Sequence, residues 1–179
     1  MLSPFVQRKI ALAFYKYDRT KNGLLEKEDL LLVGKKIAES FDLKESDRKY
    51  QEIIETYSKA WDNYLAAADI DGDGKVSLQE FFEAREKMDS SQIAKNQEVN
   101  KLMFDCLDVD GDGTISFKEY EALLKALGET NEEIIKRCFD NMDINKDGSI
   151  SRDEYANLRS GYFASEDLED PSKWFYGSF

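Results

Sequence analysis

Acidic residues recur at a fixed spacing in three twelve-residue segments of this chain. Each segment has Asp at its first position, Asp or Asn at the third, Asp at the fifth, Gly at the sixth and Glu at the twelfth. The segments Asp69–Glu80, Asp108–Glu119 and Asp143–Glu154 align without a gap. A fourth copy, Asp18–Asp29, has Thr20 at the third position and ends on Asp instead of Glu. Oxygen donors repeated at one spacing predict sites for a hard divalent cation.

The spacing is that of a loop which wraps Ca²⁺ with six to eight oxygen atoms. Positions one, three and five supply side-chain oxygens, position seven a backbone carbonyl, position nine a direct or water-mediated oxygen, and position twelve both oxygens of a carboxylate. Glycine at position six permits a sharp reversal that a Cβ atom would disfavour. The expected ligands of the three complete loops are Asp69, Asp71, Asp73, Lys75, Ser77 and Glu80; Asp108, Asp110, Asp112, Thr114, Ser116 and Glu119; and Asp143, Asn145, Asp147, Ser149, Ser151 and Glu154.

The first loop departs from this pattern at its closing residue. Asp29 is one methylene shorter than Glu, so one oxygen is expected to reach the metal, which shifts the site towards the octahedral preference of Mg²⁺. Glu26 at position nine restores a charge. The expected ligands of this loop are Asp18, Thr20, Asn22, Leu24 and Asp29. We expect three Ca²⁺ sites and a fourth, weaker or Mg²⁺-tolerant site here, with Mg²⁺ as a competitor.

The last loop is expected to bind somewhat more weakly than the two before it. Asn145 replaces a carboxylate at the third position, and Lys146 adds a positive charge beside the site. The alternative for any of the four copies is a degenerate loop that no longer binds. Three complete matches, each between amphipathic segments, argue against that alternative.

Apolar residues with helical spacing lie on both sides of every loop. Before the loops they are Val6, Ile10, Phe14 and Tyr17; Tyr50, Ile53, Ile54, Tyr57, Trp61, Tyr64, Leu65 and Ala68; Val99, Leu102, Met103 and Cys106; and Ile134, Ile135, Cys138, Phe139 and Met142. After the first three loops they are Leu30, Val33 and Ile37; Phe81, Phe82 and Met88; and Tyr120, Leu123, Leu124 and Leu127. We interpret nearly all of them as ordinary core.

Local signals place the closing carboxylates on helices and the loops in pairs. Ser77 with Glu80, and Ser116 with Glu119, have the spacing of a helix N-cap and its third residue. Thr130 and Glu133 have the same spacing and predict the start of another helix. The apolar residue at position eight is expected in a short strand that pairs with the neighbouring loop. These position-eight residues are Leu25, Val76, Ile115 and Ile150.

The predicted fold is all-α, with four EF-hands in two pairs packed as one compact globule and short β-pairing between paired loops. The expected parts are an N-terminal pair over 1–90, a C-terminal pair over 91–165, and an aromatic tail over 166–179 that packs back on the globule. Residues 44–68 read as one extended helix. The polar break at 89–91 is too short for a free linker.

The chain resembles the sarcoplasmic calcium-binding proteins and their relatives, including the bacterial calerythrin type. The resemblance covers essentially the whole chain. It is carried by the long interval of 51 residues from Asp18 to Asp69, the Asp-terminated first loop, the aromatic segment 61–64 and the ending 174–177. It implies a compact globule of four EF-hands that binds metal at three of its four loops and acts mainly as a Ca²⁺/Mg²⁺ buffer. Four loops with plausible ligands depart from that count.

Composition excludes several classes of function. With 37 acidic and 25 basic residues, the net charge is −12, and such a surface would repel the phosphates of a nucleic acid. A secretory leader and a run of apolar residues long enough for a membrane span are both missing from the sequence. Cys106 and Cys138 each lie in an apolar helical stripe and are expected as reduced core thiols. We expect a cytoplasmic monomer with no obligate protein partner and no enzymatic activity.

Three functions remain open: a buffer, a sensor that recruits a target protein, and a Ca²⁺-triggered carrier of a small apolar ligand. A sensor exposes a Met-rich groove, and this chain has only four Met. The segment 103–108 and the Phe-Tyr-Gly ending also resemble coelenterazine-binding proteins. The intact second loop counts against that reading. The related photoproteins depend on histidines, and this chain has none. These features favour the buffer.

Overall fold

The structure, a computed structural model, describes residues 2–87 and 90–177, with backbone alone for 90–96. Its α-helices are α1 (Pro4–Tyr17), α2 (Lys27–Ser40), α3 (Arg48–Ala60), α4 (Leu78–Glu86), α5 (Ser90–Leu107), α6 (Phe117–Ala126), α7 (Glu132–Met142) and α8 (Arg152–Ala164). The short strands are β1 (Leu24–Leu25), β2 (Val76–Ser77), β3 (Thr114–Ser116) and β4 (Ser149–Ser151). The predictions made for Met88, Asp89 and Phe179 lie outside the described residues. The all-α class with short β-pairing is confirmed.

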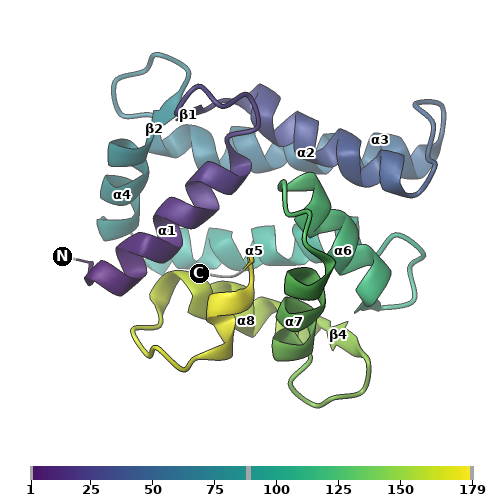
Figure 1. The fold of residues 1–179 in the computed structure, drawn as a ribbon. Coiled ribbons are helices and arrows are strands. Elements are labelled where there is room, and N and C mark those ends of the chain that lie inside the picture. Colours follow the sequence, from purple (N-terminus) through teal and green to yellow (C-terminus); the bar gives the residue numbers. More distant parts are fainter. Residues whose placement is uncertain (1, 88–89, 178–179) are drawn as a thin grey trace.

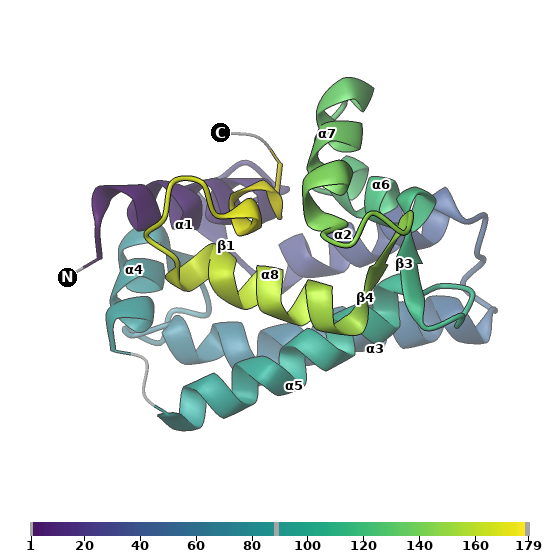
Figure 2. The ribbon, with the colours of Figure 1, turned by 90° about the horizontal axis from the view of Figure 1, so that it is seen from below.

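The two halves of the chain pack directly on each other. Helix α2 lies against α6, α1 against α8, and α3 against α5, and each of these contacts joins an N-terminal helix to a C-terminal one. Figures 1 and 2 show the helices gathered around a shared interior, with the four metal-loop segments at its periphery. The buried apolar residues form one contiguous cluster drawn from both halves.

The paired strands hold the loops together two by two. Strand β1 pairs with β2, and β3 with β4, both antiparallel. The register sets Leu25 opposite Val76, and Ile115 opposite Ile150. All four side chains are buried. The prediction that the position-eight residues lie in paired strands is therefore confirmed. Burial at the base of the loops fixes the register, because a shift by one residue would turn these side chains away from the core.

The single helix predicted over residues 44–68 is wrong at both ends. Helix α3 begins at Arg48 and ends at Ala60, after which a π-helical turn, η1 (Trp61–Leu65), and a 3₁₀ turn, η2 (Ala66–Ala68), lead into the second loop. The Ala66 N–H bonds back to the Trp61 carbonyl, five residues away. The apolar residues before and within this segment keep helical spacing in the sequence, so the hydrophobic pattern gave no sign of the turn.

The start of α7 also differs from the predicted Thr130/Glu133 box. The N-cap is Asn131, whose Oδ1 accepts the N–H groups of Glu133 (3.0 Å) and Ile134 (3.3 Å). The Glu129 carboxylate accepts the N–H of Thr130 and that of Asn131, both at 3.1 Å. The helix starts one residue later because the Asn side chain satisfies two terminal donors.

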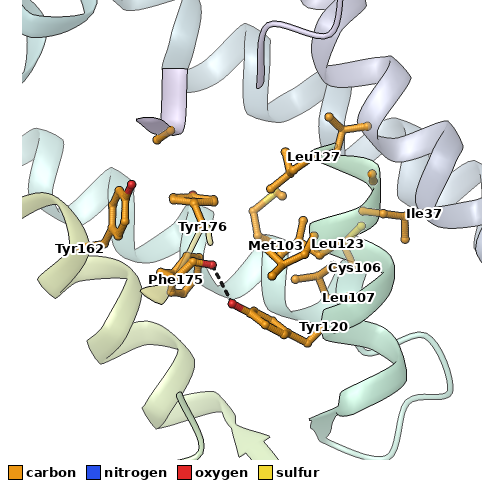
Figure 3. Packing of buried hydrophobic residues seen from close by; sticks show 14 of the residues in the cluster. Ile37, Met103, Cys106, Leu107, Tyr120, Leu123, Leu127, Tyr162, Phe175 and Tyr176 are labelled. Atoms are coloured by element: carbon orange, nitrogen blue, oxygen red, sulfur yellow. Dashed lines mark hydrogen bonds between the residues drawn. The ribbon is translucent and has the colours of Figure 1, made fainter. Parts of the chain in front are cut away.

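Two aromatic residues of the tail, Phe175 and Tyr176, lie in the core. A 3₁₀ turn, η3 (Pro171–Trp174), contacts α7 and α8, and the next two residues, Phe175 and Tyr176, are buried. The Tyr120 hydroxyl is 3.1 Å from the carbonyl oxygens of both Trp174 and Phe175 and donates to them. Figure 3 shows Phe175 and Tyr176 beside Tyr162, with the Tyr120 hydroxyl directed at the Phe175 carbonyl. The tail closes the apolar space between the halves.

A buried lysine on helix α1 bonds to the C-terminal end of α8. The Lys9 ammonium donates to the Ser165 carbonyl at 2.6 Å, and the Tyr162 hydroxyl donates to the Lys9 carbonyl at 2.7 Å. Desolvation lowers the pKa of Lys9, although the negative charge of Asp170 opposes that shift. These contacts of Lys9 join the first helix to α8 and to the segment that follows it.

Both cysteines are buried free thiols, as predicted. Burial raises the pKa of Cys106 and of Cys138 to about 12, which leaves them protonated and unreactive at neutral pH. Over the described ranges, every helix is too short or too polar to cross a bilayer.

The tail is expected to contribute strongly to stability. Truncating Phe175 to Ala should lower the free energy of unfolding by about 3–5 kcal/mol, because it opens a cavity in the core. The matched change at Leu168, which is 60% exposed, should cost no more than about 0.5 kcal/mol. Urea unfolding of both variants measures this. Equal effects would contradict the buried placement of the tail.

Candidate metal centres

Each loop opens where its entering helix ends. In three loops the first aspartate still bonds back to the helix: the N–H of Asp18, Asp108 and Asp143 donates at 2.9 Å to the carbonyl four residues before it. The second loop differs, because Asp69 follows the 3₁₀ turn and donates to the Ala66 carbonyl at 3.3 Å. The first carboxylate is thus set on the end of a rigid element in every loop.

The glycine at position six bonds to the first aspartate in all four loops. The Gly113 N–H donates to Asp108 Oδ2 at 3.0 Å, and Gly23, Gly74 and Gly148 donate to the equivalent oxygen at 2.9 Å. These glycines have φ between 81° and 90°, a region that disfavours a Cβ atom. The backbone therefore curls around the first carboxylate.

The closing glutamate ties the end of each complete loop to its start. Glu119 Oε1 accepts the N–H of Val109 at 2.7 Å, and Oε2 accepts the N–H and hydroxyl of Ser116 at 2.8 and 2.7 Å. Glu80 makes the same bonds with Ile70 and Ser77. Glu154 repeats the pattern with Ile144 and Ser151. The predicted caps at Ser77 and Ser116 are confirmed.

These hydrogen bonds keep a closing carboxylate ionised. Donation from the Ser77 backbone and hydroxyl lowers the pKa of Glu80 to about 2. A metal ligand has to be deprotonated, and a carboxylate already ionised at neutral pH takes a cation without losing a proton.

Carboxylate oxygens converge in the second and third loops. Within the described part of the chain, oxygens of Asp69, Asp71 and Asp73 lie within 4.8 Å of one another, as do those of Asp108, Asp110 and Glu119. A cation at 2.3–2.6 Å from each ligand spans about that distance between opposite oxygens. Asp108 and Glu119 are almost completely buried. This donor set suits Ca²⁺, with hard oxygens and no sulfur or imidazole.

The residues at position seven of the four loops lie at the starts of the short strands. Thr114 and Ser149 begin β3 and β4, Leu24 begins β1, and Lys75 directly precedes β2. Their backbone carbonyls are the oxygens predicted at position seven. Asp112 Oδ1 accepts both the N–H and the hydroxyl of Thr114 at 2.8 Å.

In the fourth loop, the side chain of Lys146 points away from the ligands. Its ammonium donates to the Asp140 carbonyl at the end of α7, and its backbone adopts a positive φ of 60°. Asn145 bonds to Asp147 through both amide atoms: Oδ1 accepts the Asp147 N–H at 2.9 Å, and Nδ2 donates to Asp147 Oδ2 at 2.9 Å. The weakening expected from Lys146 is therefore smaller than the sequence indicates.

The first loop is closed by a shorter but fully buried acid. Asp29 Oδ1 accepts the N–H groups of Arg19 (2.9 Å) and Thr20 (2.8 Å), and Oδ2 accepts that of Glu26 (2.9 Å). Asp29 thus makes the backbone bonds that glutamate makes elsewhere. The weaker site predicted here therefore rests on the shorter side chain, not on a different set of hydrogen bonds.

Comparisons with known proteins agree with the loop geometry. A family model described as an EF-hand domain pair matches residues 7–86 and 97–159. A sequence search of curated proteins found no match.

Solved structures with a similar fold are numerous. The calcium-loaded apo form of coelenterazine-binding protein from Renilla muelleri has a TM-score of 0.81 at 24% identity, over 99% of this chain and 100% of that one. A Streptomyces coelicolor calcium-binding protein gives 0.70 at 21% identity, over 88% and 97%. A sarcoplasmic calcium-binding protein from amphioxus gives 0.70 at 18% identity, over 98% of each. The fold implied by the resemblance in the sequence is confirmed.

Two substitutions in the fourth loop test whether the Lys146 side chain points away from the metal ligands. Asn145→Asp should tighten Ca²⁺ binding at this loop by about three- to tenfold, because it adds a charge next to the metal. Lys146→Gln should change the affinity less than about twofold, since its ammonium bonds to α7. The Gly148 amide, followed by NMR during a Ca²⁺ titration, reports on this loop alone. A larger effect of Lys146→Gln than of Asn145→Asp would contradict the placement.

Proposed function

This chain belongs to the EF-hand domain pair family and binds Ca²⁺, and we propose that it acts mainly as an intracellular Ca²⁺/Mg²⁺ buffer. The second, third and fourth loops are the Ca²⁺ sites, with the ligands predicted from the sequence, and the first is a weaker site open to Mg²⁺. We further propose a cytoplasmic monomer that performs no catalysis, with residues 1–90 and 91–165 as its two EF-hand pairs.

One observation carries the choice of buffer over sensor: the apolar helix faces are already covered. The faces of both halves pack on each other and on Phe175 and Tyr176. A sensor needs an apolar groove that opens to a target helix. Here the same surface is occupied by stiff aromatic side chains and by the chain's own tail, which favours a molecule that takes up ions without changing shape.

The charge of the loops also suits a buffer. The second and third loops each have four carboxylates among the predicted ligands, and the fourth has three. Ligand charge is one determinant of affinity in such loops, and buffers occupy the tight end of the range. We expect dissociation constants of about 10⁻⁸ to 10⁻⁶ M for these three sites.

Calorimetric titration of metal-free protein with Ca²⁺, with and without millimolar Mg²⁺, tests the proposal. At least three sites are expected in wild-type protein, and Glu80→Gln, Glu119→Gln and Glu154→Gln should each weaken one site by about 100-fold or more, because each loses its bidentate ligand. Glu52→Gln on the outer face of α3 is the control. Fewer than three sites would overturn the proposal.

An apolar dye separates buffer from sensor in the same samples. Ca²⁺ should leave the fluorescence of anilinonaphthalene sulfonate almost unchanged, because little apolar surface becomes exposed. A large Ca²⁺-dependent rise, or Ca²⁺-dependent capture by an amphipathic helix, would favour the sensor.

A cavity between the two halves favours a second candidate, a carrier of a small apolar ligand. It has a volume of about 170 Å³ and is lined mainly by apolar side chains from both halves. The hydroxyl of Tyr57, which lines it, is buried and has no hydrogen-bond partner among the residues that the structure describes. Arg159 and Tyr176 also line the cavity. An unpartnered buried hydroxyl is costly, and a bound molecule with an oxygen or nitrogen acceptor would satisfy it.

The size of the cavity limits this candidate. An engineered apolar cavity of about 150 Å³ accepts benzene, so a ligand of several rings would require the lining to move. The similar fold of the coelenterazine-binding protein makes coelenterazine the natural probe.

Fluorescence titration with coelenterazine tests the carrier. Ala84→Leu, which fills the cavity from α4, should abolish binding. Ala156→Leu lies on α8 outside the cavity lining and should leave binding unchanged. Absence of saturable binding by the wild type, together with no ligand in an organic-solvent extract of the purified protein, would overturn this candidate and leave the buffer in place.

A further inference from the structure

The first two loops are joined by an ion pair that has no counterpart in the second pair of loops. Lys75, at position seven of the second loop, places its ammonium 2.9 Å from Glu26 Oε1, at position nine of the first. Extending the β1–β2 register by one step beyond Leu25 and Val76 places these two residues opposite each other. The equivalent step between β3 and β4 is Ser116 opposite Ser149.

Glu26 therefore has a different role from the other residues at position nine. Ser77, Ser116 and Ser151 donate their hydroxyls to the closing glutamate of their own loops. Glu26 cannot donate. Its Oε1 faces the Lys75 ammonium, and its Oε2 accepts from Asn22 Nδ2 at 2.9 Å.

These contacts leave the first loop short of charge. The carboxylates at its ligand positions are Asp18, Glu26 and Asp29, and Lys75 neutralises one of them from outside the loop. Within the described residues, these three do not form one of the groups of carboxylates that converge within 4.8 Å. Asn22, itself a predicted ligand, is engaged at both ends, because its Oδ1 accepts the Leu24 N–H at 2.8 Å.

We propose that Lys75 sets the metal affinity of the first loop by holding Glu26 out of its ligand shell, so that a cation entering this loop must compete with the ammonium of its neighbour. The proposal rests on the proposed function, since it takes the first loop as the weak fourth site. Lys75 then has two roles in the N-terminal pair. Its backbone carbonyl is a predicted metal ligand in the second loop, and its ammonium holds Glu26 of the first loop away from the metal.

The expected effect is moderate, because the pair is partly solvated. The Lys75 side chain is 40% exposed and that of Glu26 is 25% exposed, and ion pairs of this kind are weak and screened by salt. The ammonium would nevertheless repel a cation in the first loop. Removing it would end this repulsion and would also free the Glu26 carboxylate to bind the cation. Both effects should raise the metal affinity of the first loop.

Lys75→Met is the test, in full-length protein titrated with CaCl₂ at low ionic strength. The amides of Gly23, Gly74, Gly113 and Gly148 each donate to the first carboxylate of one loop, so NMR follows the four loops separately. The variant should tighten binding at Gly23 by about three- to tenfold. Gly113 and Gly148 should shift by less than about twofold, and 0.5 M KCl should remove most of the gain at Gly23.

Two further variants separate the ion pair from a general effect of charge. Lys27→Met removes the same charge from position ten of the first loop itself, from a side chain of 41% exposure that pairs with Asp62 at 2.8 Å instead of with Glu26. It should have less than half the effect. In a Glu26→Gln background, Lys75→Met should no longer tighten binding at Gly23, because the restrained carboxylate is gone.

Three results would overturn the proposal. The first is an equal response of Gly23 in Lys75→Met and Lys27→Met. The second is an effect of Lys75→Met that persists in the Glu26→Gln background. The third is a Gly23 amide whose NMR signal does not change with Ca²⁺ in any variant, while the signals of the other three glycines do. In that last case the buffer still stands, whereas failure of Gly74, Gly113 and Gly148 to titrate would overturn the proposed function itself.

Discussion

The carboxylate that closes each loop is the group on which the rest of the structure depends. It caps the exiting helix, accepts an N–H from the second residue of the loop, and is a predicted ligand. In the third loop, Glu119 makes these bonds while almost completely buried at the start of α6. In the second loop, the equivalent bonds from Ser77 lower the pKa of Glu80 to about 2, so that this carboxylate is ionised at neutral pH. The loop is therefore shaped around a negative charge before any cation arrives.

Strand pairing carries this local order to the whole molecule. Ile115 and Ile150 meet at the base of the second pair of loops, and Leu25 and Val76 meet at the base of the first. Each buried contact fixes the distance between two loops and directs four helices into one core. The halves are then joined by polar contacts as well as apolar ones. The Lys49 ammonium on α3 donates to the carbonyl of Asp108, the first residue of the third loop, at 2.7 Å.

What the sequence predicts well is what short-range chemistry determines. The loops and the Ser–Glu caps follow from residues within a dozen positions of each other. The strand register follows from setting the eighth positions of two loops opposite each other. The π turn at Trp61 was not predicted, because the apolar residues through it keep helical spacing and the change is in the hydrogen-bond ladder. The cap of α7 moved to Asn131 because two neighbouring residues could each have served, and spacing does not choose between them.

Two expectations about charge depend on where long side chains reach, and the structure adds to both of them. Lys146 was expected to weaken its own loop, yet its four-carbon stem carries the ammonium to the end of α7. Glu26 was expected to add charge to the first loop, yet Lys75 reaches it across the strand pair. Position in a loop fixes where a backbone carbonyl or a short Asp side chain points. For the longer side chains of lysine and glutamate, the direction depends on the nearest acceptor or donor in space. Which residue that is depends on the fold.

The same contacts bear on how the protein can respond to metal. Helix α5, which enters the third loop, is held at its C-terminal end by Lys49 from the other half. Helix α6, which leaves that loop, is held by the bonds from the Tyr120 hydroxyl to the tail. A helix pair can open on binding only if at least one helix is free to rotate. Both helices are anchored to parts of the chain outside their own EF-hand. Such anchoring supports the proposal of a buffer, in which the binding free energy would stabilise one arrangement of the helices.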